Sequence, residues 1–427
     1  MTSVYPVSAS INQLRLDNLM EGQLSVGREY MPSSFRQEWA EVHSYAASTM
    51  ADPNRSAFTH QMAKVLFAAT SFVGNVPAGK QPNYYQYMDG QMLDWYLEPD
   101  TAATVGLIGR SLNGILALLK MLRGFETRSL NGLEAYHRGH FDETHIRRRI
   151  ELIEEALEMA RQFGATDVED PVCLDEPLES FAASTSRQCA LIHLMGAPLT
   201  QSHDEVLFVR VLQASELCFL GIRLTVSAAI AAITSNEPRG AVQKLQTAAQ
   251  FAQLLRELLR ILRTMPVEHF ATFRSLTGKA SALQSIGYHL MDTLLHGLNT
   301  EKLEHFRRIE HLKPVLTFCD PDFVSLKQAV LDTEECQPEW AEVWAACRQL
   351  DKDLLLWRGL HLGFAKRYIP HNGPGTGGTS GAQYLRQHLF RGIFDDHEPD
   401  WDSVREMFPD LEPNGHHHAV PSVLIVP

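Results

Sequence analysis

Residues 202–234 read SHDEVLFVRVLQASELCFLGIRLTVSAAIAAIT, and this stretch decides the class of fold. Ser202 and Glu205 have the spacing of a capping box, in which the serine hydroxyl accepts a hydrogen bond from the third backbone N–H and the glutamate reaches back. The residues that follow are mostly apolar and do not alternate with polar ones, as a half-buried strand would require. The stretch therefore predicts one long helix from Asp204 to about residue 233.

Helical patterns continue along most of the chain, and no alternating run is long enough to predict a sheet. Residues 1–50 are mixed and weakly periodic, and residues 73–102 are rich in Pro, Gly, Asn and Tyr. Further helices are predicted over residues 103–124, 144–163, 239–263, 280–298, 301–311, 322–332, 338–367 and 382–392, with a short one that begins near Val267. We therefore expect an all-α fold, a helical bundle.

The helix predicted over 144–163 has Thr144 as its N-cap and ends at Gly164. An apolar stripe of isoleucine and leucine side chains forms one face of this helix. The other face carries Arg147, Arg148 and Arg149 together with three glutamates. Charge runs of this kind are most simply exposed to solvent, so we expect this whole face to be solvated.

An acidic segment over 164–185 contains Pro171 and Pro177 and has few strong apolar repeats, which indicates a linker. We therefore predict a helical N-terminal domain of unknown role over 1–175 and a second domain over 176–395. The polar tail over 396–427 contains three adjacent histidines. They can hold a metal, but a flexible tail is the simpler interpretation.

The composition limits the partners that we expect. The chain has 427 residues, with 38 Lys and Arg against 51 Asp and Glu, which gives a net charge of −13. An acidic surface repels phosphate backbones, so no nucleic acid partner is expected. Six scattered cysteines without a C-x-x-C motif indicate neither a zinc cluster nor a disulfide framework. No basic leader with an apolar core begins the sequence, so we predict a cytoplasmic protein without a membrane partner.

Three segments are candidates for chemistry. In WRGLHLGF (357–364), His361 lies on an apolar helix face with Trp357 and Phe364, the arrangement that presents a proximal haem ligand, although a lone core histidine has the same pattern. The glycine-rich segment over 375–381 can bind an anion or polar head group through exposed N–H groups, or can be a plain turn. The small residues of 280–289 allow close packing against a helix or a flat cofactor.

Taken in order, these segments resemble the tryptophan 2,3-dioxygenase family of haem enzymes. DEVLFVRVLQASEL (204–217) resembles the family's D-E-x-L-F-I…H-Q…E-L helix, and TMPVEHFATFRSLTGKASALQS (264–285) resembles its T-M…F…F-R…A-S-G-F-Q-S stretch. WRGLH (357–361) resembles the W-R-x-x-H run, and GTGGTSG (375–381) resembles G-T-G-G-[ST]-S-G. The resemblance covers about 186–392, roughly half of the chain.

The resemblance implies the following site. His361 would be the axial ligand of the iron of haem b, with Trp357 and Ser281 beside the cofactor. O2 would be the co-substrate. The residues that would contact the substrate are Phe208, Leu283, His289, Gly375, Thr376 and Gly377.

Two positions depart from the family pattern at places where catalytic residues are expected. Leu212 stands where the family has its distal histidine, and His289 stands where the family has the arginine that binds the substrate carboxylate. A histidine cannot reproduce the bidentate fork that an arginine forms with a carboxylate. Either Arg210 or Arg274 compensates, or the substrate is not plain L-tryptophan.

The resemblance implies a haem-dependent oxygenase that inserts oxygen from O2 into the indole ring of tryptophan or a similar substrate. The missing arginine favours a different reaction, that of a monooxygenase or hydroxylase of a modified aromatic amino acid. The sequence is also compatible with a non-catalytic haem-binding protein and with a helical interaction protein that lacks haem. A homodimer or homotetramer is expected by analogy with the family.

Overall fold

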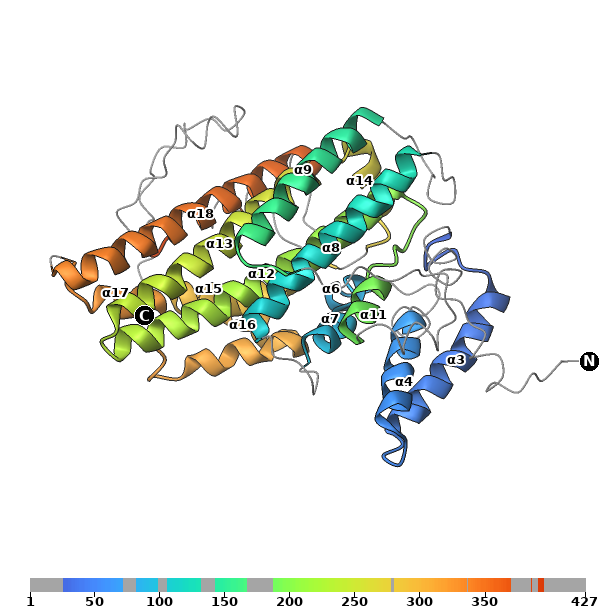
Figure 1. Cartoon of the computed structure of the whole chain (residues 1–427), viewed down its shortest axis with the longest axis horizontal. Helices are drawn as coiled ribbons and strands as arrows, with labels where there is room; N and C mark the ends of the chain where they lie inside the picture. Colours follow the sequence, from blue (N-terminus) through green and yellow to red (C-terminus); the bar gives the residue numbers. More distant parts are fainter. Residues whose placement is uncertain are drawn as a thin grey trace, which may run out of the picture.

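The computed structural model describes residues 26–71, 82–98, 106–131, 143–166, 187–277, 280–335, 337–369, 385 and 391–394. Within these ranges every regular element is helical and none is a strand, which confirms the predicted all-α class. The long helices lie side by side as a bundle, and the shorter N-terminal helices gather near one end of it (Figure 1).

Five long helices form the bundle: α8 (Leu107–Leu130), α9 (Glu143–Gln162), α12 (His203–Thr234), α13 (Pro238–Leu262) and α18 (Pro338–Tyr368). The central helix, α12, packs along both α13 and α8, while α13 also packs against α18 and α9. Helix α12 is long and apolar enough to cross a membrane, but the core helix of a globular protein has the same properties. Neighbouring helices cover most of its residues here.

Shorter helices complete the fold. Four of them precede α8 in the chain: α3 (Ser33–Ala51), α4 (Ala57–Ala69), α6 (Tyr84–Tyr87) and α7 (Gly90–Leu97). A fifth, α11 (Arg187–Leu194), lies between α9 and α12 in the chain. Those between α13 and α18 are α14 (Val267–Arg274), η2 (Ala282–Gln284), α15 (Ile286–His296), η3 (Thr300–Lys302), α16 (Leu303–Arg308), η4 (Glu310–Cys319) and α17 (Leu326–Leu331).

Where the apolar pattern is long, each predicted helix overlaps an observed one, although α8 begins at Leu107 and continues to Leu130, beyond its predicted end at residue 124. The helix predicted over 280–298 differs, because residues 282–284 form a 3₁₀ turn and the α-helix begins at Ile286, with the Ser285 hydroxyl as its cap. The sequence did not predict α3, α4, α6, α7, α11 or most of η4, because their apolar repeats are weak or short. The helix predicted over 382–392 lies almost entirely outside the described residues.

The predicted capping box at Ser202 is wrong. The Ser202 side chain makes no cap hydrogen bond to the helix. Glu205 instead turns back to the preceding loop, where its carboxylate accepts from the backbone N–H groups of Leu199 at 2.9 Å and Thr200 at 2.8 Å, and from the Thr200 hydroxyl. Glu205 is fully buried, so these loop donors satisfy a carboxylate that water cannot reach.

The prediction of a wholly solvated charged face on α9 is also wrong at one position. Arg149 is only 1% exposed, because it shares a helix face with the buried Ile146 and Ile153, three and four residues away. Its guanidinium forms ion pairs of 2.6 Å with both Glu126 and Asp204. The expectation does describe Arg148, which is exposed.

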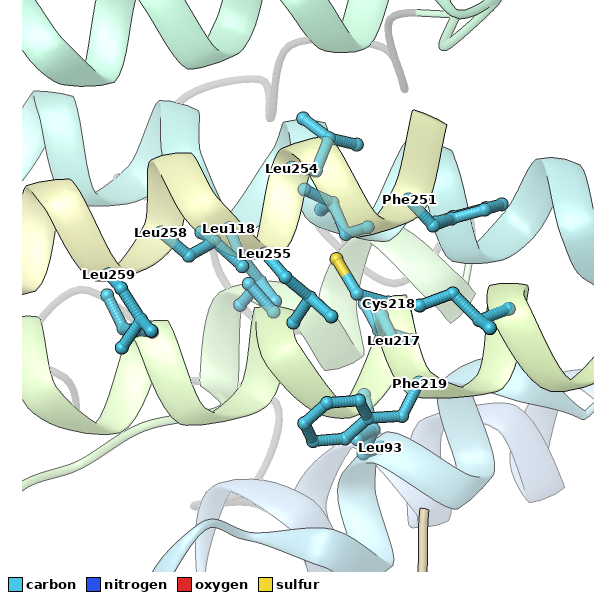
Figure 2. Packing of buried hydrophobic residues seen from close by; sticks show 14 of the residues in the cluster. Leu93, Leu118, Leu217, Cys218, Phe219, Phe251, Leu254, Leu255, Leu258 and Leu259 are labelled. Carbon is cyan, nitrogen blue, oxygen red and sulfur yellow. The ribbon is translucent and has the colours of Figure 1, made fainter. Parts of the chain in front are cut away.

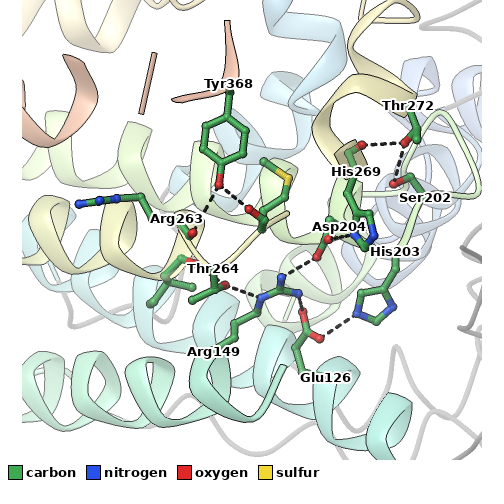
Figure 3. A network of polar contacts seen from close by, with 12 residues as sticks. Glu126, Arg149, Ser202, His203, Asp204, Arg263, Thr264, His269, Thr272 and Tyr368 are labelled. Carbon is green, nitrogen blue, oxygen red and sulfur yellow. Dashed lines mark hydrogen bonds and ion pairs between the residues drawn. The ribbon is translucent and has the colours of Figure 1, made fainter. Parts of the chain in front are cut away.

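The ion pairs of Arg149 are the centre of a buried network that joins α8, α9, α12 and α14 to the segment that follows α13 (Figure 3). Arg149 on α9 also donates to the Thr264 hydroxyl just after α13, at 2.8 Å. His203 on α12 bonds to Glu126 on α8 at 2.8 Å, and His269 on α14 bonds to Asp204. The network therefore fixes the N-terminal end of α12 against α8, α9 and α14.

One apolar core crosses the predicted domain boundary at residue 175. Leu93 of α7 and Leu118 of α8 belong to the same buried cluster as Leu217 and Phe219 of α12 and Phe251 of α13 (Figure 2). Most of the predicted linker lies outside the described residues, so the division of the chain at 175 stays a prediction.

Replacing Arg149 with alanine should strongly destabilise the protein. The change leaves Glu126 and Asp204 as buried carboxylates without their cation, which typically costs about 3–5 kcal/mol. Arg148→Ala is the matched control, because Arg148 and its partner Glu151 are both exposed, and solvent screens an exposed pair so that its loss changes stability little. Urea unfolding measures both variants, and equal free energies of unfolding would contradict the role of Arg149.

The stability of the fold should decrease in acid through Asp204. Burial raises the pKa of this carboxyl, but Arg149 and His269 lower it more, to about 2. A lowered pKa contributes stability that is fully present above the unfolded value, near 4, and is lost as pH falls toward 2. Because each unit by which the folded pKa lies below the unfolded pKa corresponds to ~1.4 kcal/mol, the stability that is lost is about 2 kcal/mol. Between pH 5 and 2 the free energy of unfolding in urea should decrease less for Asp204→Asn than for the wild type. Equal decreases in the two proteins would refute the contribution of Asp204.

Candidate functional site

A cavity of about 260 Å³ lies between α12, α14, α15 and α18, with α6 on one side. Aromatic and aliphatic side chains form most of its wall, and a few polar groups interrupt them. This combination is typical of pockets that bind small molecules or cofactors. The residues of α12 that line the cavity are Phe208, Val211, Leu212, Ser215 and Phe219.

His361 reaches the cavity from α18. Its ring stacks on Trp357, with 5.8 Å between ring centroids and 27° between planes. Burial lowers the pKa of His361 to about 4, so the imidazole is neutral at physiological pH. Among the described residues the structure assigns no hydrogen-bond partner to this ring. A neutral imidazole that borders an apolar cavity is chemically suited to bind a metal through a ring nitrogen.

Three polar residues meet at the boundary between α6, α12 and α15. The Tyr84 hydroxyl donates to Glu216 Oε1 at 2.9 Å, and the Ser285 hydroxyl donates to the same oxygen. Tyr84 and Ser285 line the cavity, while Glu216 lies behind them. Burial raises the pKa of Glu216, and the hydrogen bonds from Ser285 and Tyr84 oppose that shift.

Gly287 allows Glu216 to lie close to the backbone of α15. A Cβ atom at Gly287 would be 2.3 Å from Glu216 Oε2, which is far inside a van der Waals contact. The Gly287 backbone also contributes a hydrogen bond to the carboxylate. The carboxylate therefore occupies a position that is open only because residue 287 has no side chain.

Of the described residues that line the cavity, those with a formal charge are basic: Arg274, Lys302 and Arg358. Arg358 donates to the Arg391 carbonyl and lies 2.9 Å from His296 Nε2, so its head group is positioned by neighbours. Burial lowers the pKa of Lys302, and the nearby Asp292 opposes that effect. Asp292 also lies 3.7 Å from Arg358, so it offsets part of the positive charge that the wall offers to anionic groups of a ligand.

Comparison with known proteins shows several related sequences. A tryptophan 2,3-dioxygenase of Bradyrhizobium diazoefficiens is 29% identical over 238 residues, which cover 47% of this chain and 85% of that protein. The tryptophan 2,3-dioxygenase of a Nocardioides species is 28% identical over 225 residues, covering 46% of this chain and 83% of that protein. The C-terminal half of the chain resembles the tryptophan 2,3-dioxygenase superfamily. No family model matches the sequence.

A tryptophan 2,3-dioxygenase of Anaeromyxobacter is 25% identical over 256 residues, which cover 52% of this chain and 96% of that protein. These similarities confirm the resemblance inferred from the four sequence motifs.

The structure brings together most of the residues that the resemblance to tryptophan 2,3-dioxygenases selected. The predicted site residues that line the cavity are Phe208, Leu212, Ser281, Leu283, Trp357 and His361. They come from three segments that are distant in sequence, and their convergence agrees with a common site. Gly375, Thr376 and Gly377 lie outside the described residues.

His289 is not among the residues that line the cavity. It is buried, and its Nε2 atom lies 2.8 Å from the carbonyl oxygen of Leu283. Its ring packs edge-on against Phe306, 4.9 Å between centroids. Burial lowers the pKa of His289 to about 4, and Lys302 adds to this shift. The ring therefore supports the backbone of the 281–285 segment, and its predicted contact with the substrate stays a prediction.

The two arginines that were candidates to bind a carboxylate have different positions. Arg274 lines the cavity and lies over the Phe270 ring at 5.9 Å. Arg210 is buried outside the cavity wall, where it donates to Gln213 Oε1 at 3.2 Å, and burial lowers its pKa to about 10. Of the two, only Arg274 is placed to meet a ligand.

Tyr84 and Tyr87 line the cavity but were not predicted as site residues. They are three residues apart on the short helix α6, so they project from one face of it. The only sequence signal was the concentration of tyrosines between residues 84 and 87. Tyr87 donates to Glu205 Oε1 at 3.2 Å, which connects the cavity to the start of α12.

Gly287→Ala should disturb the cavity wall. The new methyl group forces Glu216 or α15 to move, and strain of this kind costs about 1–3 kcal/mol. Gly240→Ala is the control, because a Cβ atom there meets only ordinary van der Waals contacts at 3.7 Å or more. Thermal and urea unfolding should show a clear loss of stability for Gly287→Ala and almost no loss for the control variant. A Gly287→Ala protein as stable as Gly240→Ala would contradict the close approach of Glu216.

Proposed function

We propose that this protein is a haem-dependent oxygenase that inserts oxygen from O2 into an aromatic substrate, with the indole ring of tryptophan or a tryptophan-like molecule as the preferred class. The observation that carries the proposal is the neutral His361 imidazole at the wall of an apolar cavity, without a hydrogen-bond partner among the described residues. The similarity to tryptophan 2,3-dioxygenases supports the same chemistry.

The donor set fits haem b better than a metal ion held by protein ligands alone. Within the described part of the chain no three His, Cys, Asp or Glu side chains gather as a metal site. A haem iron needs only one or two protein ligands, because the porphyrin supplies the others. The apolar walls suit a macrocycle, and Arg274, Lys302 and Arg358 suit its propionates.

Haem, when bound, supplies the oxygen chemistry. The protein contributes an axial nitrogen from His361, a wall that excludes water, and an aromatic surface for the substrate. Phe208 and Phe219 on α12 provide that surface, and Phe270 adds a third ring from α14. Leu212 lies on the same wall and offers neither a base nor a hydrogen bond.

A second candidate function is that of a monooxygenase or hydroxylase that acts on a modified aromatic amino acid. Leu212 is apolar and His289 lies outside the cavity wall, so neither supplies the contacts expected for free L-tryptophan. Incubation of the reduced, haem-loaded protein with aromatic amino acids under ¹⁸O₂ distinguishes these reactions. Mass spectrometry then shows a product with two labelled atoms for a dioxygenase, one for a monooxygenase, and none for a haem protein without this activity.

His361→Ala should abolish stable binding of hemin by the full chain. The substitution removes the imidazole that reaches the cavity and leaves the neighbouring Trp357 in place. His60→Ala is the control, because His60 on α4 bonds to the Met50 carbonyl and does not line the cavity. Titration with hemin, followed at the Soret band, should show tight binding for the wild type and for His60→Ala only. Equal hemin affinity for His361→Ala would refute the ligand assignment.

A further inference from the structure

The hydrogen-bond directions around Glu216 determine what the cavity can bind. Glu216 is buried, and its carboxylate accepts from the hydroxyls of Tyr84 and Ser285. A phenol has one proton and retains acceptor capacity on its oxygen after donating it. The proton of Tyr84 is therefore directed at the carboxylate, and its oxygen can only accept from a ligand.

The Ser285 hydroxyl already makes two hydrogen bonds, one as donor and one as acceptor. Its hydroxyl donates to Glu216, and it also accepts from the backbone N–H of Tyr288 at 3.0 Å as the cap of α15. The Ser285 hydroxyl lies within reach of the Tyr84 oxygen, but its one proton is directed at Glu216 Oε1, and among the described residues no N–H group donates to the Tyr84 oxygen. Tyr84 is therefore the member of this group that has an acceptor site for a ligand in the cavity that it lines.

The backbone holds the Tyr84 side chain in this position. The Tyr84 backbone N–H donates to Gln284 Oε1 at 2.8 Å, which attaches α6 to the segment that precedes α15. Tyr84 is only 5% exposed, so a ligand reaches its oxygen only from within the cavity. Glu216 lies one helical turn after Leu212 on α12, so the Tyr84 oxygen that it orients is close to the apolar Leu212 side chain on the cavity wall.

Tyr87 is a weaker acceptor candidate. Its bond to Glu205 is longer, at 3.2 Å, and Glu205 is already satisfied by the loop before α12. The Tyr87 ring lies beside Phe208, with 6.2 Å between centroids, which places it with the aromatic part of the wall.

We propose that the Tyr84 oxygen accepts a hydrogen bond from a donor on the aromatic ring of the substrate, such as an indole N–H or a phenol O–H. The carboxylate of Glu216 sets this polarity by holding the tyrosine proton. The inference rests on the proposed function, since it assigns a substrate contact in the same cavity. It makes Tyr84 a residue that determines specificity for ring donors.

The test compares two probes that differ only at the ring donor: L-tryptophan, and 3-benzothienyl-L-alanine, in which sulfur replaces the N–H. Isothermal titration calorimetry on the hemin-treated full chain measures both affinities. The wild type should prefer L-tryptophan by about 5-fold, as one neutral hydrogen bond allows. Tyr84→Phe should reduce that preference to about 1-fold. A preference that Tyr84→Phe leaves unchanged would overturn the proposal.

Tyr85→Phe is the matched control. Tyr85 is the next residue and its hydroxyl bonds to Asp94 at 2.7 Å, but it does not line the cavity. This variant should keep the wild-type preference, and a loss equal to that of Tyr84→Phe would contradict a direct contact.

Glu216→Gln tests whether the carboxylate sets the direction of the hydrogen bond, because glutamine has nearly the same size as glutamate. The amide can donate to the Tyr84 oxygen, which frees the phenol proton and occupies the acceptor site. The preference for L-tryptophan should then decrease toward 1-fold while the Tyr84 ring remains; an unchanged preference would contradict control by the carboxylate.

The calorimetric readout separates this inference from the proposed function. If hemin produces no Soret band with the wild type, the haem assignment fails. The inference about Tyr84 is still supported if the wild type prefers L-tryptophan and Tyr84→Phe does not. If hemin binds and the two proteins discriminate equally, the inference fails and the haem assignment stands.

Discussion

Arg149 is a buried cation between two buried carboxylates, and the position of the central helix depends on it. Charges that are removed from water are tolerated only when they are paired and hydrogen-bonded. Glu126, Asp204 and Thr264 provide those partners from three different parts of the chain. Because Asp204 is in the first turn of α12, the network determines where that helix begins and which of its residues face α14.

The cavity is a consequence of this placement. Helix α12 presents aromatic and aliphatic residues toward α14, α15 and α18, and the long α18 brings His361 to the same space. Ser215 is the polar residue of α12 on this wall, and Glu216, the next residue, is buried behind two hydroxyl groups that satisfy it. The site thus combines one neutral imidazole, an apolar wall, basic side chains and one oriented phenol. A redox cofactor with a single protein ligand and an aromatic substrate would use each of these features.

The sequence predicted the long helices because their apolar residues repeat over many turns, as in α12, α13 and α18. Near the N-terminus the apolar repeat is weak in α3 and spans few turns in α6 and α7, and contacts such as those of the fully buried Ala46 and Val65 stabilise helices of this region. Charge alone could not reveal that Arg149 is buried, because its partners come from other helices. The bond between Tyr84 and Glu216 joins residues 132 positions apart, so no local pattern indicates it. Sequence motifs did identify His361, Phe208 and Ser281, which line one cavity.

Resonance Raman spectroscopy of the ferrous, hemin-loaded full chain tests the central claim most directly, because the iron–imidazole stretching band reports the bond to the axial histidine. The account predicts this band in the wild type and its absence in His361→Ala. Added imidazole should restore an iron–imidazole band in the variant, since the cavity left by the side chain can admit the free ligand. A wild-type spectrum without the band, or an identical band in His361→Ala, would contradict the assignment of His361 as the haem ligand.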